Sequence, residues 1–392
     1  MAKIAVASCH DKRNFGSMLQ AWATERAVEL LGCDVVTIDK TGLGADIGRG
    51  RRSYYLEHLF DAELYRAKLG FVGHRLRQKT DKGFGSEMAR RYRAFGRFAA
   101  ERFRMSPRFG SFEELGGWTR GLDAVVVGSD QLWLPVNIAG GYYTLDFVEG
   151  PCCKVSYATS FGVSELPERY MREVARFLPT FSAVSVREDT GADLAERATG
   201  TRPEVVCDPT MLLSRGEWES VADNSLAPNA PYALCYFMGK NLWQRDCARR
   251  EADRRGLKLV AIAHPDEYVK YDDSYADVYP WDAGPAEWVG LVSHADMVFT
   301  DSFHGTAFSN IFERPFVSFR RHVNMGAQST NSRIDSLLRR LGLEGRICET
   351  EEDFGSVALA DVDFGASRPR LERFRSGSRT WLEAALSGEV AR

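Results

Sequence analysis

Short apolar runs alternate with longer amphipathic segments along most of this 392-residue chain, and this alternation restricts the fold more than any other feature. The run KIAVAS at 3–8 precedes a helix-length segment at 15–32, and a second apolar run, DVVTID, follows at 34–39. Short apolar runs separated by helical stretches are typical of parallel strands joined by crossover helices. The sequence therefore predicts an α/β protein.

The alternation falls into two series with a junction near 209–230. Further strands of the first series are predicted at 123–129, 154–160, 182–188 and 204–213, and those of the second at 232–238, 258–263, 295–302 and 315–319. Helical segments at 243–256 and 285–295 separate strands of the second series. We expect two Rossmann-like domains, 1–212 and 213–392, that face a central cleft as in the glycosyltransferase-B fold. Residues 49–108 are predicted as a mostly helical insertion, and 379–390 as a final helix that packs back on the first domain.

Composition excludes several functional classes. A net charge of −3 and a pI near 6.2 give no reason to expect a nucleic-acid partner. No apolar stretch approaches the roughly 20 residues of a transmembrane helix, which indicates a cytoplasmic protein. The eight cysteines lack the spacing of a zinc site or a disulfide framework, and they are expected to be free thiols.

Basic residues are concentrated at 49–108, in stretches such as RGRRSYY and ARRYRAFGRF. The simplest interpretation is the solvated face of one or more helices. The alternative is a docking surface for an anionic acceptor or for a membrane, with peripheral membrane association.

Polar clusters follow six of the predicted strands. In an open parallel sheet, ligands bind beyond the carboxyl ends of the strands, where helix N-termini also point. The clusters are Ser8–Gly16, Gly128–Gln131, Thr159–Gly162, Arg187–Asp189, Asp301–Gly305 and Arg320–Arg321. We therefore expect them to border one cleft.

Basic side chains in these clusters favour an anion site. His304 and Arg320 follow consecutive strands of one predicted βαβ unit, and Arg187 would face them from the other domain. Two guanidinium groups, an imidazole and a helix N-terminus are suited to a small, highly charged anion.

Simpler interpretations stay open for several of these residues. Ser302 is a natural helix cap, and Arg187 is placed to pair with Glu188 or Asp189. The GSDQLW stretch at 128–133 is compatible with a tight turn that buries Trp133. The chain has no GxGxxG, GxxxxGK[ST] or HExxH motif, and neither a nucleotide cofactor nor a metal is expected.

The chain resembles the polysaccharide pyruvyl transferase family over nearly its whole length. The resemblance rests on ordered motifs, namely NFGSMLQAWA (14–23), VVVGSDQLW (125–133), VSYATSFG (155–162), SVRED (185–189), VCDPTMLL (206–213), VFTDSFHGTAFSNIFERPFVSF (298–319) and NSRIDSLLRRLGL (331–343). It implies the two-domain fold inferred above. It also implies transfer of the enolpyruvyl skeleton of phosphoenolpyruvate onto a sugar as a ketal, with release of phosphate and with no cofactor beyond this donor.

Matching motif positions suggest the residues that bind the donor. Arg187 and His304 correspond to phosphoenolpyruvate-binding and catalytic residues of the family. Arg320 is the best match for a further basic residue, and Arg321 lies beside it. Ser302 and Gly305 would complete the donor site. The imidazole is suited either to general acid catalysis or to stabilising the departing phosphate.

The remaining roles are less defined. Asp130 and Asp301 are candidate proton acceptors for the attacking hydroxyl. The saccharide acceptor, lipid- or nucleotide-linked, is expected near Asn14, Gly16, Gln20, Ser129 and Gln131. Two other functions fit the same fold, which does not determine chemistry by itself. These are a nucleotide-sugar glycosyltransferase and a non-catalytic member of a polysaccharide assembly.

Overall fold

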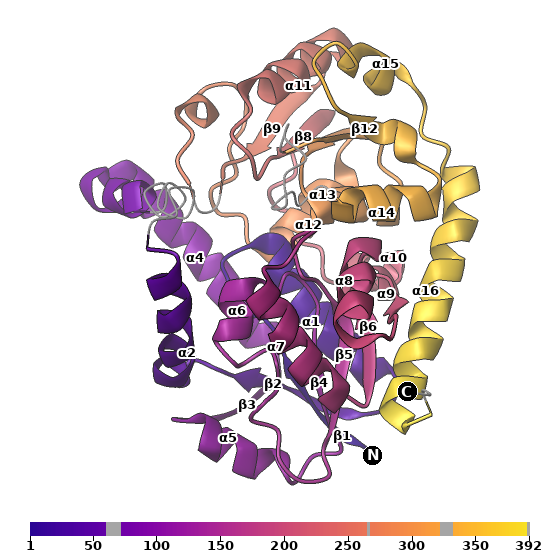
Figure 1. Ribbon diagram of the computed structural model, residues 1–392. Helices are drawn as coiled ribbons and strands as arrows, with labels where there is room; N and C mark the ends of the chain where they lie inside the picture. The colour runs from indigo at the N-terminus through magenta and orange to yellow at the C-terminus, as the bar shows by residue number, and fades with distance from the viewer. Residues whose placement is uncertain (60–71, 265–266, 322–331, 390–392) are drawn as a thin grey trace.

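A computed structural model describes residues 1–59, 72–264, 267–321 and 332–389, and these residues form two parallel sheets flanked by helices (Figure 1). The first sheet has seven strands in the order β3-β2-β1-β4-β5-β6-β7. Its strands are β1 Lys3–Ala7, β2 Asp34–Asp39, β3 Met105–Arg108, β4 Ala124–Val127, β5 Cys153–Thr159, β6 Ala183–Val186 and β7 Glu204–Val205.

The second sheet has five strands in the order β12-β11-β10-β8-β9. They are β8 Tyr232–Tyr236, β9 Lys258–Ile262, β10 Met297–Thr300, β11 Phe316–Phe319 and β12 Ile347–Cys348. Every strand pairing in both sheets is parallel. The predicted fold class, two Rossmann-like domains, is confirmed by this topology.

Both faces of each sheet are buried, which explains why the strands are apolar without strict alternation. Along β1, Ile4 and Val6 join one apolar cluster while Ala5 and Ala7 join another. The first sheet reverses its order between β1 and β4, and the second between β8 and β10. Each reversal opens a crevice at the carboxyl ends of the two central strands.

Helices connect the strands and cover the sheets. Those before the junction are α1 Phe15–Leu30, α2 Gly44–Glu57, α4 Lys82–Arg102, α5 Phe112–Thr119, α6 Pro135–Ala139, α7 Glu168–Phe177, α8 Asp189–Thr199, α9 Pro209–Leu212 and α10 Arg215–Glu219. Those after it are α11 Leu242–Arg255, α12 Pro285–His294, α13 Phe303–Ile311, α14 Ser332–Leu341, α15 Phe354–Leu359 and α16 Phe364–Ser387. Residues 72–80 are also helical, and 3₁₀ turns lie at Leu178–Thr180, Lys270–Asp273 and Glu344–Arg346.

The long helix α16 runs beside both domains (Figure 1). The Cys207 backbone N–H donates a hydrogen bond of 2.9 Å to Ser378 Oγ, and Trp381 lies 6.1 Å from the ring of Tyr157 on β5. The same helix also packs against α14. It therefore connects the last part of the chain to the first domain.

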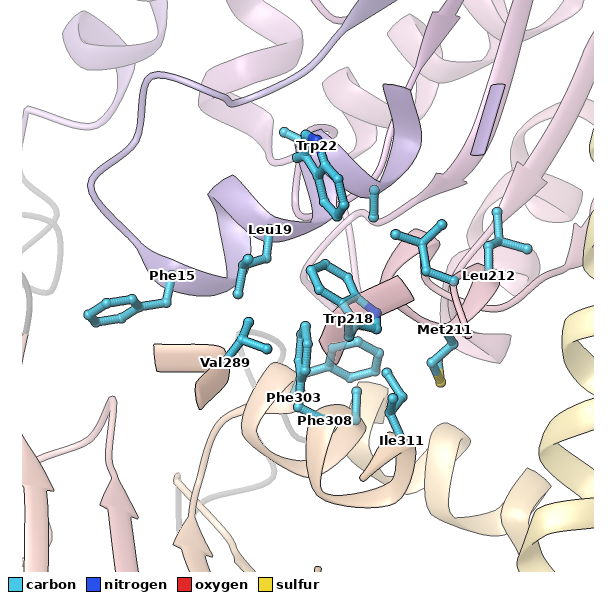
Figure 2. Packing of buried hydrophobic residues seen from close by; sticks show 14 of the residues in the cluster. Phe15, Leu19, Trp22, Met211, Leu212, Trp218, Val289, Phe303, Phe308 and Ile311 are labelled. Carbon is cyan, nitrogen blue, oxygen red and sulfur yellow. The ribbon is translucent and has the colours of Figure 1, made fainter. Parts of the chain in front are cut away.

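The apolar core continues across the domain junction. Trp218 of α10 is fully buried, and its ring centroid lies 5.3 Å from Trp22 of α1 and 4.7 Å from Phe308 of α13. Figure 2 shows these rings packed together, with Val289 of α12 close by. Trp218 Nε1 donates a 2.8 Å hydrogen bond to the Thr210 carbonyl, so its polar atom is satisfied.

The insertion at 49–108 differs in part from the prediction. Its described residues are mostly helical, but 105–108 form the edge strand β3 beside β2, and residues 60–71 lie outside the described part. The polar segment MSPR lacks the apolar character of a core strand, which is why its composition did not indicate one. The predicted strand at 204–213 is also shorter, because Asp208 and Pro209 begin helix α9.

Several basic residues of the insertion bind the second domain. Arg90 pairs with Asp282, and Arg97 pairs with Glu287. Arg91 is buried and donates a 3.0 Å hydrogen bond to the Ala263 carbonyl. The cations of α4 therefore join the two domains rather than only facing solvent.

Trp218→Ala is expected to lower the free energy of unfolding by about 3–5 kcal/mol, because it leaves a large cavity at the junction. Since its neighbours belong to both domains, we also expect a single cooperative transition for the wild type. Urea unfolding followed by fluorescence and by circular dichroism measures both the free energy of unfolding and the number of transitions. Leu242→Ala, at a half-exposed position, is the control and should change stability by less than about 0.5 kcal/mol. Two separate wild-type transitions would contradict the shared core.

Candidate active site

The described residues form a cavity of 510 Å³ between the two domains. Glu267, Arg321 and Arg333 reach the cavity from the segments after β9 and β11 and from α14. The rest of its walls comes from the segments after β1 and β4 in the first sheet and after β8 and β10 in the second. These are the strands at which each sheet reverses its order, where a ligand crevice is expected. The lining residues are Lys12, Arg13, Asn14, Ser17, Asp130, Gln131, Met238, Glu267, Ser302, Phe303, His304, Arg321 and Arg333.

The first turn of α1 forms the wall on the side of the first domain. Asn14 caps this helix, because its Oδ1 accepts a hydrogen bond of 3.1 Å from the Ser17 backbone N–H. Ser17 Oγ donates a 2.7 Å hydrogen bond to Oδ2 of Asp130, which follows β4. The cap and the hydroxyl therefore connect the polar ends of two neighbouring strands.

His304 lies in the first turn of α13, on the opposite wall. Ser302 caps that helix by accepting a 3.4 Å hydrogen bond from the Gly305 backbone N–H. The His304 ring lies directly against Gly16 of α1, where an added Cβ would be only 2.1 Å from Nδ1. Only glycine at position 16 allows this close approach, so the first turn of α1 helps to define the orientation of the imidazole.

A buried carboxylate, Asp208, lies behind His304. Its Oδ2 accepts hydrogen bonds from Arg187 Nη1 at 2.7 Å and from Ser129 Oγ at 3.0 Å, and it lies 3.7 Å from His304 Nε2. Burial disfavours ionisation of Asp208, but His304 and Arg187 hold the pKa of this carboxyl well below its usual range. Asp208 is therefore a charged group that connects residues of both domains.

Arg187 is buried at the centre of this charge network. Its guanidinium lies 4.5 Å from the Phe303 ring centroid, and Nη2 is 3.6 Å from Asp130 Oδ1. Burial opposes the charge of Arg187, but Asp208 and Asp130 raise its pKa above the usual value. Burial likewise opposes ionisation of Asp130, whereas Lys12 and Arg187 keep the pKa of this carboxyl far below its usual range.

Four cationic side chains besides His304 line the cavity. Arg333 is 8% exposed, its Nε has no hydrogen-bond partner, and it forms no ion pair with another described residue. Burial and the nearby charge of Arg187 lower the pKa of Arg333 to about 9, so it remains charged at neutral pH. Arg13 lies over the Tyr92 ring at 3.8 Å, and Lys12 has no ion pair within the described part of the chain. The cavity is therefore suited to an anion.

Apart from Arg320, the sequence-predicted residues divide into two groups. Those that line the cavity are Asn14, Asp130, Gln131, Ser302 and His304. Those that lie behind its walls or contact a lining side chain are Gly16, Gln20, Ser129, Arg187, Asp301 and Gly305.

The residues behind the walls have structural contacts. Gln20 Nε2 donates to the Ser17 carbonyl at 2.8 Å, and Gln20 Oε1 accepts from the Ser129 backbone N–H at 2.8 Å. Gly305 packs against β10, where an added Cβ would lie 2.3 Å from Thr300 Oγ1. Gln20, Ser129 and Gly305 do not line the cavity, so the structure gives them supporting positions.

Arg320 does not line the cavity, contrary to expectation. Its Nη1 donates to Asp335 Oδ2 at 2.6 Å, and its Nη2 donates to Glu349 Oε1 at 2.9 Å. These two carboxylates hold the guanidinium outside the cavity. The neighbouring Arg321 lines it instead, with Nη2 donating to the Asp301 carbonyl at 3.0 Å.

Asp301 is also placed differently from the prediction. Its carboxylate is buried and accepts backbone hydrogen bonds from Met238 at 2.6 Å and from Gly239 at 2.7 Å. It also lies 3.6 Å from Arg321 Nε. Asp301 thus holds the loop after β8 and helps to position Arg321, while it is not exposed to the cavity.

Sequence reasoning missed Asp208, Arg333 and Lys12. Asp208 and Arg333 lie inside two of the motifs quoted above, VCDPTMLL and NSRIDSLLRRLGL, but their side-chain directions were not deduced from those motifs. Lys12 lies in the first polar cluster, between β1 and α1. Lys12 and Asp208 follow strands and Arg333 lies in the first turn of α14, so sequence position was informative for all three, whereas the direction of their side chains was not.

The described residues offer neither a metal-binding group nor a membrane-spanning helix. They contain no group of three or more His, Cys, Asp or Glu side chains arranged to hold a metal ion. None of their helices combines the length and the apolar composition needed to cross a membrane.

Gly16→Ala is expected to lower the free energy of unfolding by about 1–3 kcal/mol, because the new methyl group overlaps the His304 ring. In a His304→Ala background the same substitution should cost much less, since the overlapping ring is absent. Urea unfolding of the four proteins measures this coupling. The matched control is Gly96→Ala in α4, where an added Cβ meets no atom within 4 Å. An equal cost of Gly16→Ala in both backgrounds would show that the two residues are not in contact.

Comparison with solved structures gives distant matches. The UDP-GlcNAc 2-epimerase of Methanocaldococcus jannaschii has 13% identity and a TM-score of 0.45, with 92% of this chain and 94% of that chain covered. MurG of Acinetobacter baumannii has 9% identity and a TM-score of 0.45, with 99% of each chain covered. HepE of Anabaena, solved with UDP-glucose, has 9% identity and a TM-score of 0.48, with 99% and 100% covered.

No curated protein sequence matches this chain. A family model does match, and it spans residues 14–322, from the cap of α1 to just beyond β11. The matched region includes Gly16, Asp130, Arg187, Asp208 and His304, whose contacts are described above. On this match the chain belongs to the polysaccharide pyruvyl transferase family.

Proposed function

We propose that the protein transfers the enolpyruvyl group of phosphoenolpyruvate to a saccharide as a ketal and releases phosphate. Membership of the family supports pyruvylation of a polysaccharide or its precursor. The observation that carries the choice of donor is Arg333, a buried guanidinium on the cavity wall without an ion pair among the described residues. A buried unpaired charge is costly, and an anionic ligand in the cavity would compensate it.

The cavity matches the charge distribution of phosphoenolpyruvate. This donor carries a carboxylate and a phosphate, and guanidinium groups bind both through paired hydrogen bonds. Arg321, Arg333 and His304 line the wall of the second domain beside the N-terminus of α13. A helix N-terminus adds a partial positive charge and further favours an anion. We therefore assign Arg321 and Arg333 the role that the sequence had suggested for Arg320.

Ketal formation requires a proton on the methylene carbon of the donor, attack of one hydroxyl on the enol carbon, departure of phosphate, and attack of a second hydroxyl. The acceptor loses two hydroxyl protons in total. One is accounted for by the new methyl group, and the other leaves with the released phosphate. We propose His304 as the proton donor, since it is the histidine that lines the described cavity wall. Asp208, 3.7 Å from Nε2, is the positioning residue for its ring.

Arg187 and Asp130 are assigned positioning roles in this proposal. Arg187 is paired with Asp208 at 2.7 Å, and it lies behind Phe303 and His304 rather than on the wall. Asp130 lines the wall, but the low pKa of its carboxyl makes it a weak base. Its proposed function is to hold Arg187 in place and to offset the charge of Lys12, rather than to remove the hydroxyl proton.

The wall of the first domain is the proposed acceptor side. The cavity volume of 510 Å³ is typical of sites for ligands much larger than a three-carbon acid. Asn14, Ser17 and Gln131 offer hydroxyl and amide groups that hydrogen-bond sugars. Lys12 and Arg13 add positive charge on the same side, which favours an acceptor that carries a phosphate group.

Phosphoenolpyruvate is expected to raise the melting temperature of the wild type, and Arg333→Ala should weaken its binding about ten- to a hundred-fold through loss of a charge-assisted contact. Arg320→Ala is the matched control, because its guanidinium is paired outside the cavity. Without ligand, Arg333→Ala should be at least as stable as the wild type, since it removes an unpaired buried charge. The measurement is the melting temperature of the wild type, Arg333→Ala and Arg320→Ala across a titration with phosphoenolpyruvate.

The same assay separates this proposal from a nucleotide-sugar glycosyltransferase. Stabilisation by nucleoside diphosphates or nucleotide sugars, and none by phosphoenolpyruvate, would favour the glycosyltransferase. Equal weakening by Arg320→Ala and Arg333→Ala would contradict the assignment of Arg333 to the donor.

His304→Ala is expected to lower turnover by at least about a hundred-fold, the usual contribution of a positioned proton donor. The measurement is release of inorganic phosphate from phosphoenolpyruvate, with a saccharide acceptor that the wild type pyruvylates. The melting temperature without ligand serves as the control for folding. A folded variant with a nearly normal rate would refute the role of His304.

A further inference from the structure

Exposed apolar side chains are concentrated in two short stretches of the chain, 55–59 and 72–76. Among the described residues, eleven large apolar side chains are exposed, and five of them fall within the ten residues at 55–59 and 72–76. They are Tyr55, Leu56, Leu59, Val72 and Leu76, with exposed fractions from 36% to 66%. Scattered exposed apolar residues are normal, but a cluster of this density indicates an interaction surface.

These side chains share helix faces with basic residues. On α2, Arg52, Tyr55 and Leu56 have the spacing of one helix face. On the helix at 72–80, Val72 and Leu76 are four residues apart, and the exposed Lys79 follows three residues later. Figure 1 shows both helices on the outer side of the molecule, to the left of the two sheets. We call Arg52, Tyr55, Leu56, Val72, Leu76 and Lys79 the apolar–basic surface.

The cations of this surface differ from those of the neighbouring helix α4. Arg90 and Arg97 of α4 form ion pairs with acids of the second domain. Arg52 and Lys79 are exposed, and neither forms an ion pair with any residue that the structure describes. Their charge is therefore directed to solvent beside exposed apolar groups.

We propose that the apolar–basic surface binds an anionic lipid membrane. Apolar side chains on helix faces that also carry Arg or Lys are suited to the boundary between headgroups and acyl chains. The apolar groups enter that boundary while the long basic side chains reach the anionic headgroups. Charge complementarity thus favours a lipid surface over an uncharged partner. This inference does not depend on the proposed donor or on the chemistry of the cavity.

The test is co-sedimentation of the full chain with vesicles of phosphatidylcholine and phosphatidylglycerol, and with vesicles of phosphatidylcholine alone. We expect binding to the anionic vesicles and much weaker binding to the neutral ones or at high salt. Leu56→Glu with Leu76→Glu should lower the partition constant at least about ten-fold, because it places charge in the apolar contact. Arg52→Glu with Lys79→Glu should lower it as well, by about five-fold or more for each residue.

The matched control is Leu242→Glu with Leu359→Glu, two exposed leucines at 50% and 64% outside this surface. These control substitutions should leave vesicle binding unchanged, and the melting temperatures of all variants should stay close to that of the wild type. Absence of wild-type binding to anionic vesicles would overturn the proposal. Equal loss in the control variant would overturn it too. The wild type could instead self-associate without binding vesicles, while the Leu56→Glu, Leu76→Glu variant is monomeric. That result would identify the surface as a protein interface.

Discussion

The arrangement of the two domains depends on the charge network around the buried carboxylate of Asp208. Isolated in an apolar interior, this charge would be strongly destabilising. It is compensated by Arg187 and Ser129 from the first domain, and it faces His304 from the second at 3.7 Å. Separating the domains would remove the imidazole from this network, so the candidate site and the domain contact rely on the same charges.

Close packing reinforces this coupling. Gly16 contacts the His304 ring, and the aromatic cluster around Trp218 also joins α1 to α13. Because packed interiors tolerate little change in volume, a shift of α1 relative to α13 would alter the orientation of the imidazole. The two helix N-termini at the cavity are thus held by a continuous apolar core, which is the support a precise catalytic geometry needs.

The sequence predicted the sheets and the location of the site well, because buried parallel strands are apolar and ligands bind at their carboxyl ends. It predicted side-chain direction poorly. Arg320 and Arg321 are adjacent beyond β11, and only the acids Asp335 and Glu349, distant in sequence, determine that Arg320 points away. Asp301 was likewise assigned to the cavity, whereas the backbone N–H groups of Met238 and Gly239 hold it inside. Such choices depend on tertiary partners that no local pattern contains.

Whether a cationic side chain forms an ion pair distinguishes a structural role from a ligand-binding role better than the number of cations does. In the insertion, Arg90 and Arg97 are neutralised by acids of the second domain, so their charge stabilises the fold. In the cavity, Arg333 is buried without such a partner among the described residues, and this is the basis on which an anionic donor is proposed. The same criterion, applied at the exposed face of α2, distinguishes Arg52 from the paired residues of α4. An unpaired cation next to a cavity or an apolar surface is therefore the feature from which both proposed ligands, the anionic donor and the anionic membrane, are inferred.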